Sequence, residues 1–105
     1  MPALPDRSCR LDAPLRAVSG RWKPAILWQL RSGPVGYAEL HRRIDGVSER
    51  MLARQLQQLT ADGVVRRTVT PSTPPRVDYD LTDRGAALLP LLDEFLARWQ
   101  DSEPS

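Results

Sequence analysis

The sequence contains very few of the residues on which several classes of protein depend. Among its 105 residues there is one cysteine, one histidine and one lysine. A lone cysteine cannot form a disulfide within the chain, which favours a reducing compartment such as the cytoplasm. A lone histidine, His41, leaves no cluster of histidine and cysteine for a zinc site, so we expect no metal and no cofactor. His41 is instead expected to be a surface or half-buried helix residue.

Long apolar runs and catalytic patterns are also missing. No apolar run approaches the ~20 residues that cross a bilayer, and residues 1–12 lack the basic-then-apolar order of a signal peptide. No arrangement of serine, histidine and aspartate and no glycine-rich phosphate loop can be recognised. Asp93 and Glu94 are adjacent on an expected helix and point apart, which argues against a catalytic pair. We therefore expect a cytoplasmic protein that has no membrane partner and is not an enzyme.

The charge is unevenly distributed along the chain. The net charge is +2, but residues 1–36 sum to +4, residues 37–77 to +3 and residues 78–105 to −5. All basic residues except Lys23 are arginines. The planar arginine fork can bind guanine edges and phosphates with two hydrogen bonds. A genome that favours arginine over lysine would explain the same bias, and both explanations stay open.

The length predicts one domain, because typical domains run to about 100–150 residues. Residues 1–10 are expected to form a flexible arm that carries Cys9, residues 11–100 the folded domain, and residues 101–105 a disordered tail. Apolar residues at helical spacing predict helices at 11–18, from Pro24 to the Gly33-Pro34 stop, at 38–44, at 48–62, and from Thr82 to about Gln100. Pro90 is expected to kink or divide the last helix.

The segment from Val47 to Leu81 is the most informative. Ser48 is a good N-cap, and Gly63 is a good helix stop. Two strands with alternating apolar residues follow at 64–70 and 77–81, joined by a loop stiffened by prolines. Together with the preceding short helix and the Asp45-Gly46 turn, this order predicts a winged helix-turn-helix: a mainly α fold with a small β-hairpin wing and extra N- and C-terminal helices.

The helix at 48–62 divides into two faces at 100° per residue. One face carries Leu52, Gln55, Leu56 and Leu59, and the opposite face carries Arg50, Ala53, Arg54 and Gln57. The first would pack on the core. On the second, small Ala53 would allow close approach to a DNA groove, arginine can bind guanine, and glutamine can bind adenine. A merely solvated polar face is the alternative, which the flanking helix, turn and hairpin make less favoured.

Other basic and polar residues could add contacts to double-stranded DNA. Ser48 could donate to a phosphate at the helix N-terminus. Arg76, at the edge of the 64–81 wing, could enter a minor groove or remain a solvated charge. Arg42, like the adjacent arginine, is either a phosphate contact or solvated. Arg66 and Arg67 point to opposite faces of their strand, so at most one of them is expected to face DNA.

The last predicted helix carries more apolar residues than one core-facing stripe needs. Its set is Leu88, Leu89, Leu91, Leu92, Phe95, Leu96 and Trp99. Small domains rarely leave such a patch in water, so we expect a homodimer interface. Its predicted residues are Leu11, Leu15, Leu92, Phe95, Leu96 and Trp99. A single wide core face is the alternative. The tryptophans Trp22 and Trp28 are expected in the core, or else along a small-molecule pocket.

Cys9 has two open interpretations. It lies between Arg7 and Arg10, and positive charge near a thiol lowers its pKa and raises its reactivity. Oxidation or attack on an electrophile could then act as a switch. In the alternative, Cys9 is a small apolar residue without a signalling role.

A series of short motifs follows a fixed order along the chain: Cys9, Gly20-Arg21-Trp22, Ile26-Leu27 with Leu30, Gly33-Pro34, Tyr37 with Glu39-Leu40, Ile44 with Gly46-Val47-Ser48 and Met51-Leu52, Leu56 with Leu59, Asp62-Gly63-Val64-Val65, Pro74-Pro75-Arg76-Val77-Asp78-Tyr79, and Leu81-Thr82 with Gly85. In these motifs the chain resembles the HxlR family of bacterial winged-helix regulators, which is related in architecture to the MarR group. The family usually has proline after the cysteine, where this chain has Arg10. The resemblance implies a homodimer on near-palindromic operators and, in some members, a response to electrophiles, oxidants or aldehydes through the N-terminal cysteine.

Two functions of different classes remain open at this point. The favoured one is a homodimeric, sequence-specific DNA-binding transcriptional regulator, switched through Cys9 or by a small-molecule effector. The other is a winged-helix protein-interaction module with no role in DNA binding. Salt-dependent DNA binding would separate them, because phosphate contacts release counterions.

Overall fold

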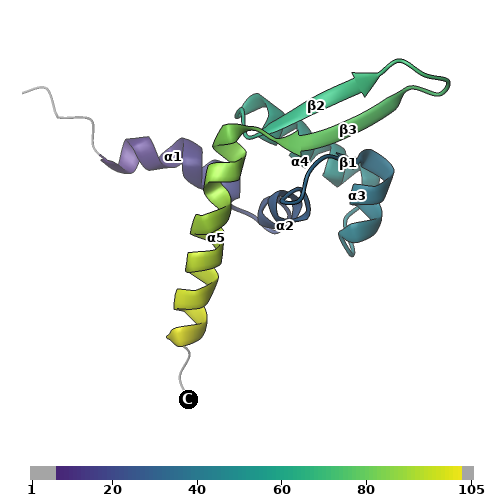
Figure 1. The fold of residues 1–105 in the computed structure, drawn as a ribbon. Helices are drawn as coiled ribbons and strands as arrows, with labels where there is room; N and C mark the ends of the chain where they lie inside the picture. Colours follow the sequence, from purple (N-terminus) through teal and green to yellow (C-terminus); the bar gives the residue numbers. More distant parts are fainter. Residues whose placement is uncertain (1–6, 103–105) are drawn as a thin grey trace, which may run out of the picture.

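The computed structural model describes residues 7–102, with side chains from Arg10 onward. In chain order the elements are α1 (Arg7–Val18), α2 (Lys23–Gln29), β1 (Val35–Gly36), α3 (Tyr37–Arg43), α4 (Glu49–Ala61), β2 (Val65–Thr70), β3 (Arg76–Leu81) and α5 (Asp83–Asp101) (Figure 1). Five helices and a small antiparallel sheet make a winged helix-turn-helix, which confirms the predicted fold class.

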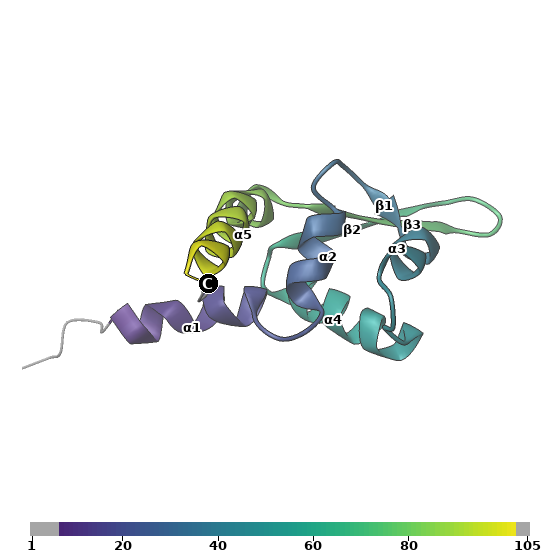
Figure 2. The same ribbon diagram turned by 90° about the horizontal axis from the view of Figure 1, so that it is seen from below.

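The sheet has the strand order β1-β3-β2 and is antiparallel throughout. Val35 pairs with Tyr79, and the β2–β3 hairpin pairs from Val65 with Leu81 at its base to Thr70 with Arg76 at its end. The hairpin is the wing, and it extends from one end of the domain while α1 and α5 lie at the other (Figures 1 and 2). Val65 is buried, whereas Val69 on the same face is 45% exposed, because the wing continues past the core.

The core lies among α2, α3, α4 and the base of the sheet. Helical spacing and strand alternation account for most of its members, as predicted. The buried set is Ala17, Ile26, Leu27, Leu30, Val35, Leu40, Ile44, Val47, Leu52, Leu56, Leu59, Val64, Val65 and Tyr79. Half-buried Leu88, Leu89 and Leu92 of α5 pack against it. One face of α5 is therefore a core face, which leaves the rest of that helix free of the domain.

Helix α1 begins at Arg7, four residues before the start predicted at residue 11. The helix signal was missed because residues 7–10 carry no apolar period, although arginine itself is a good helix former. Residues 7–10 of the expected flexible arm are therefore helical, and residues 1–6 lie outside the described residues. Cys9 belongs to the helical stretch, but its side chain lies outside the described residues. So do residues 103–105 of the expected tail, while Asp101 still belongs to α5.

Two other expectations need correction. Helix α5 is not divided at Pro90, because one continuous helix runs from Asp83 to Asp101. Pro90 and Ala86 are both exposed, so the carbonyl that loses its helical partner can be solvated. Trp22 packs against the core as predicted, but Trp28 does not: it is 39% exposed and lies under the guanidinium of Arg31. Within residues 7–102 no helix is long and apolar enough to cross a membrane.

Candidate nucleic-acid interface

Helix α4 is bounded by well-formed caps at both ends. The Ser48 hydroxyl oxygen accepts the backbone N–H of Met51 at 3.0 Å, which confirms the predicted N-cap. At the other end Gly63 has a φ of 76°, its N–H donates to Thr60 O, and the N–H of Val64 donates to Leu59 O. These two bonds form a Schellman motif, which fixes the last turn of a helix. Ser48 and Gly63, both identified as cap residues from the sequence, thus define the two ends of α4.

The predicted division of α4 into two faces is confirmed by burial. Leu52, Leu56 and Leu59 are fully buried and Gln55 is half-buried. Arg50, Ala53, Arg54 and Gln57 are all exposed. Among the described residues neither arginine takes part in an ion pair. The exposed face therefore offers two available guanidinium groups and one carboxamide on a rigid helix.

The turn between α3 and α4 is held by two side chains of α3. The Tyr37 hydroxyl donates to Glu49 O at 2.9 Å, and His41 Nε2 lies 2.9 Å from Val47 O. A carbonyl can only accept, so His41 carries its proton on Nε2 in this contact. Burial, with smaller effects of the charge of Glu49 and of Tyr79, raises the pKa of Tyr37. Both side chains tie the start of α4 to the preceding helix, as a helix-turn-helix requires.

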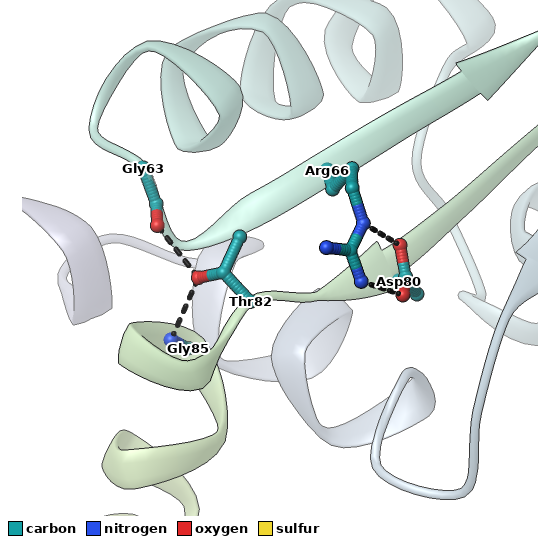
Figure 3. Close-up of polar contacts among 5 residues, drawn as sticks. All are labelled: Gly63, Arg66, Asp80, Thr82 and Gly85. Atoms are coloured by element: carbon teal, nitrogen blue, oxygen red, sulfur yellow. Dashed lines mark hydrogen bonds and ion pairs between the residues drawn. The ribbon is translucent and has the colours of Figure 1, made fainter.

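Two arginines of the wing form ion pairs with aspartates of β3. Arg66 donates to Asp80 from Nη2 at 2.6 Å and from Nε at 3.2 Å (Figure 3). Arg76, predicted to reach a minor groove, lies at the end of the hairpin and donates from Nε to Asp78 at 3.1 Å. The Arg76 side chain is 70% exposed, so its guanidinium can reach a ligand once this ion pair opens.

The remaining predicted polar residues lie around α4 with different partners. Ser48 is exposed, and its hydroxyl proton stays available after the N-cap bond is made. Arg42 is exposed but forms an ion pair with Glu39, which also binds Arg43 at 3.0 Å. Exposed ion pairs of this kind contribute little stability and can open at low cost. Arg42 is thus less available for a phosphate than the arginines of α4.

Arg67 is the residue that sequence reasoning left undecided. It alternates with Arg66 along β2, is exposed, and takes part in no ion pair within the described part of the chain. Two aspartates on β3 distinguish Arg67 from Arg66, because they lie opposite Arg66 and Thr68 but not opposite Arg67. The sequence alone does not show this difference, because it depends on the register in which β2 pairs with β3.

An apolar groove lies at the opposite end of the domain, between α1, α2 and α5. Its volume is about 680 Å³, and its lining includes Leu11, Leu15, Trp28, Leu92, Phe95 and Leu96. Phe95 is 71% exposed, the neighbouring Trp99 is 64% exposed, and Leu15 is 54% exposed. Five of the six predicted interface residues are therefore apolar and exposed, while Leu92 is half-buried against the core.

The arrangement of helices and wing matches that of a known protein family. Residues 17–104 match the HxlR-like helix-turn-helix family. The chain belongs to this family. An uncharacterized HTH-type transcriptional regulator of Methanothermobacter thermautotrophicus is 37% identical over 91 residues, covering 87% of this chain and 69% of that protein. The HxlR-family chain is thus a transcriptional regulator of the helix-turn-helix type, as predicted.

Solved structures of similar proteins include the transcriptional regulator YodB and the redox regulator HypR. The reduced form of the transcriptional regulator YodB from Bacillus subtilis has a TM-score of 0.80 and 34% identity, covering 91% of this chain and 95% of that chain. The redox regulator HypR in its reduced form has a TM-score of 0.79 and 32% identity, covering 89% and 91%. The HxlR-family fold of this chain is therefore shared over nearly its whole length with both proteins.

Proposed function

We propose that this HxlR-family protein is a homodimeric, sequence-specific DNA-binding regulator. In this proposal α4 enters the major groove, and Arg50, Arg54 and Gln57 bind base edges while Ala53 allows close approach. Ser48 and Arg42 contact phosphates, and Arg76 on the wing reaches the adjacent minor groove. The observation that carries the proposal is the exposed face of α4, where two arginines stand without an ion pair in the described structure.

The homodimer is proposed to form through the apolar groove and the exposed faces of α1 and α5. The occupant is a second copy of this chain, because the groove continues onto exposed Phe95 and Trp99, which a two-fold axis would bring against their own copies. Contiguous exposed apolar surface of this kind often marks a protein–protein interface. Such a dimer would present two α4 helices to successive major grooves, about 34 Å apart, on a near-palindromic operator.

The proposal can be tested by selecting bound duplexes from a random DNA pool and titrating the selected duplex at several salt concentrations. We expect a two-fold symmetric site and an affinity that falls steeply as salt rises, because each phosphate contact releases counterions. Arg50→Ala/Arg54→Ala protein should lose the sequence preference. Failure of the wild-type protein to bind any duplex above background would overturn the proposal and favour a protein-interaction module.

A second proposal concerns control: we propose that oxidation or electrophile modification of Cys9 releases the operator. The similar structures include the redox regulator HypR in reduced and oxidised forms and YodB after treatment with diamide. Cys9 is the one cysteine of this chain, and Arg7 and Arg10 flank it. Oxidation of a lone cysteine would give a sulfenic acid or a disulfide between two subunits.

The control proposal is tested by measuring operator release after peroxide, diamide or quinone treatment. Wild-type protein should release the operator, and Cys9→Ser protein should retain it. Equal release by both proteins would remove Cys9 from the mechanism. Retention by both would favour a small-molecule effector instead, for which the groove beside Trp28 is the candidate pocket.

A further inference from the structure

The C-terminal end of α4 is bonded directly to the N-terminal end of α5. The Thr82 hydroxyl donates to Gly63 O at 2.6 Å and accepts the N–H of Gly85 at 3.2 Å (Figure 3). The N–H of Thr82 donates to Val64 O at 3.2 Å. Thr82 is thus the N-cap of α5, and its hydroxyl also bonds to Gly63 at the C-terminal end of α4. This contact joins residues 19 positions apart and bypasses the whole wing.

Gly85 makes this close approach of the two helices possible. It is buried in the first turn of α5, and a Cβ built on it would lie 2.1 Å from Val64 O and 3.2 Å from Leu81 Cδ2. Any side chain here would push α5 away from the connection between α4 and β2. The missing side chain at Gly85 therefore lets the backbone of α5 lie directly against the backbone that follows α4.

Helix α1 is tied to the same end of α4. Arg16 Nη2 lies 3.2 Å from Asp62 Oδ1, where Asp62 is the C-cap of α4. Arg84 of α5 donates from Nη1 to Asp62 O at 3.0 Å, and Lys23 donates to Arg16 O at 3.0 Å. Helices α1 and α5, which line the apolar groove together with α2, are thus both connected to the C-terminal cap of α4.

We propose that Thr82, together with Arg16, is a positioning residue that sets the separation of the two α4 helices in the dimer. These two residues therefore set which half-site spacing the protein prefers, an inference that rests on the function proposed above. In a two-fold dimer α5 stands at the axis and α4 stands at the DNA, so a change of angle at this junction is carried to both reading faces. The wing cannot do this, because its hairpin extends away from α5 (Figure 1).

The first test measures the separation without DNA. Nitroxide labels are placed at Ala53→Cys in Cys9→Ser protein, and the distance between the two α4 helices is measured by electron spin resonance. Labelled protein with Thr82 and Arg16 unchanged should give one narrow distribution of the distance between the two α4 helices. Thr82→Val, which keeps the shape but loses the hydroxyl, should give a broadened or shifted one, while Thr82→Ser should match the wild type. Arg16→Gln, at a side chain that is 58% exposed, should broaden it in the same way.

The second test uses duplexes that carry two copies of the selected half-site with centre-to-centre spacing varied by single base pairs around about 10. The ratio of affinities between the best spacing and its neighbours should fall in Thr82→Val protein by up to about fivefold, because the lost hydrogen bond holds the junction with about that factor. Thr82→Ser should restore it. A uniform loss of affinity at every spacing, with unchanged α4 distances, would show a merely structural role and overturn the proposal. Absence of any inter-subunit distance in wild-type labelled protein would instead overturn the dimer itself.

Discussion

Arg66 and Asp80 face each other across the wing and form a two-bond ion pair, with Nη2 2.6 Å from Oδ2 and Nε 3.2 Å from Oδ1. The hydrogen bond and the charge of Asp80 raise the pKa of Arg66. Its neighbour Arg67 has no ion-pair partner within the described residues. Two adjacent arginines of the same strand thus differ in what they can offer to a phosphate backbone, because strand alternation places an aspartate opposite only one of them.

This difference predicts different effects of two matched substitutions. Arg67→Ala should weaken DNA binding and reduce the slope of log affinity against log salt by about one, as loss of one phosphate contact does. Arg66→Ala should leave the slope unchanged, because its charge is already compensated by Asp80. Fluorescence anisotropy titrations at several salt concentrations measure both quantities. The assignment fails if Arg66→Ala lowers the slope and Arg67→Ala does not.

Arg54 predicts a loss of specific rather than general binding. It is exposed on α4, between Ala53 and the half-buried Gln55. Arg54→Ala should weaken binding to the selected operator by about 1–3 kcal/mol, the usual worth of an arginine bound to guanine. Binding to an unrelated duplex should change much less. Arg98→Ala is the matched control, because Arg98 lies on α5 in an exposed ion pair with Glu94. Unchanged operator affinity at fixed salt would exclude Arg54 from base contacts.

The elements that follow local rules could be predicted from the sequence. Ser48 and Gly63 cap α4 as expected, and Thr82 begins the last helix as its N-cap, because a capping bond needs only residues within one turn. The two faces of α4 follow from helical periodicity alone. The exposed apolar face of α5 was predicted for a similar reason, since the helix carries more apolar residues than one side can bury.

The parts that depend on tertiary register could not be predicted. The pairing of Arg66 with Asp80 requires the exact register of the hairpin, which a loop of several prolines does not reveal. The bond from Thr82 to Gly63 requires the packing of α5 against the end of α4, which no local pattern encodes. Trp28 is exposed because its side of α2 faces the apolar groove, and periodicity alone cannot tell that face from the core.

Tyr37 predicts an alkaline limit to stability. Its hydroxyl donates to Glu49 O, and its pKa is raised above the ordinary value of 10.0, first by burial. The protonated form is therefore favoured by folding, so its contribution is complete below pH 10.0 and is lost as the pH rises through the higher folded pKa. Tyr37→Phe should cost about 1 kcal/mol at neutral pH, the worth of one hydrogen bond.

The pH dependence separates this effect from simple loss of packing. Urea unfolding at neutral pH and above pH 10.0 gives the free energy of unfolding in each condition. Wild-type protein should lose more stability across this interval than Tyr37→Phe protein, because the variant has no phenol to ionise at that position. Equal losses in both proteins would contradict the role given to Tyr37.

Phe95 predicts that the dimer can be broken without unfolding the domain. Its side chain is 71% exposed and lines the apolar groove, so a charge there is tolerated in water but not against a second apolar surface. Phe95→Glu protein should be monomeric by light scattering, keep the helical circular dichroism of the wild type, and bind the selected operator more weakly. Ala97→Glu is the control, because Ala97 is exposed on the same helix but does not line the groove. A wild-type monomer, or a Phe95→Glu dimer, would show that the apolar face of α5 serves another partner.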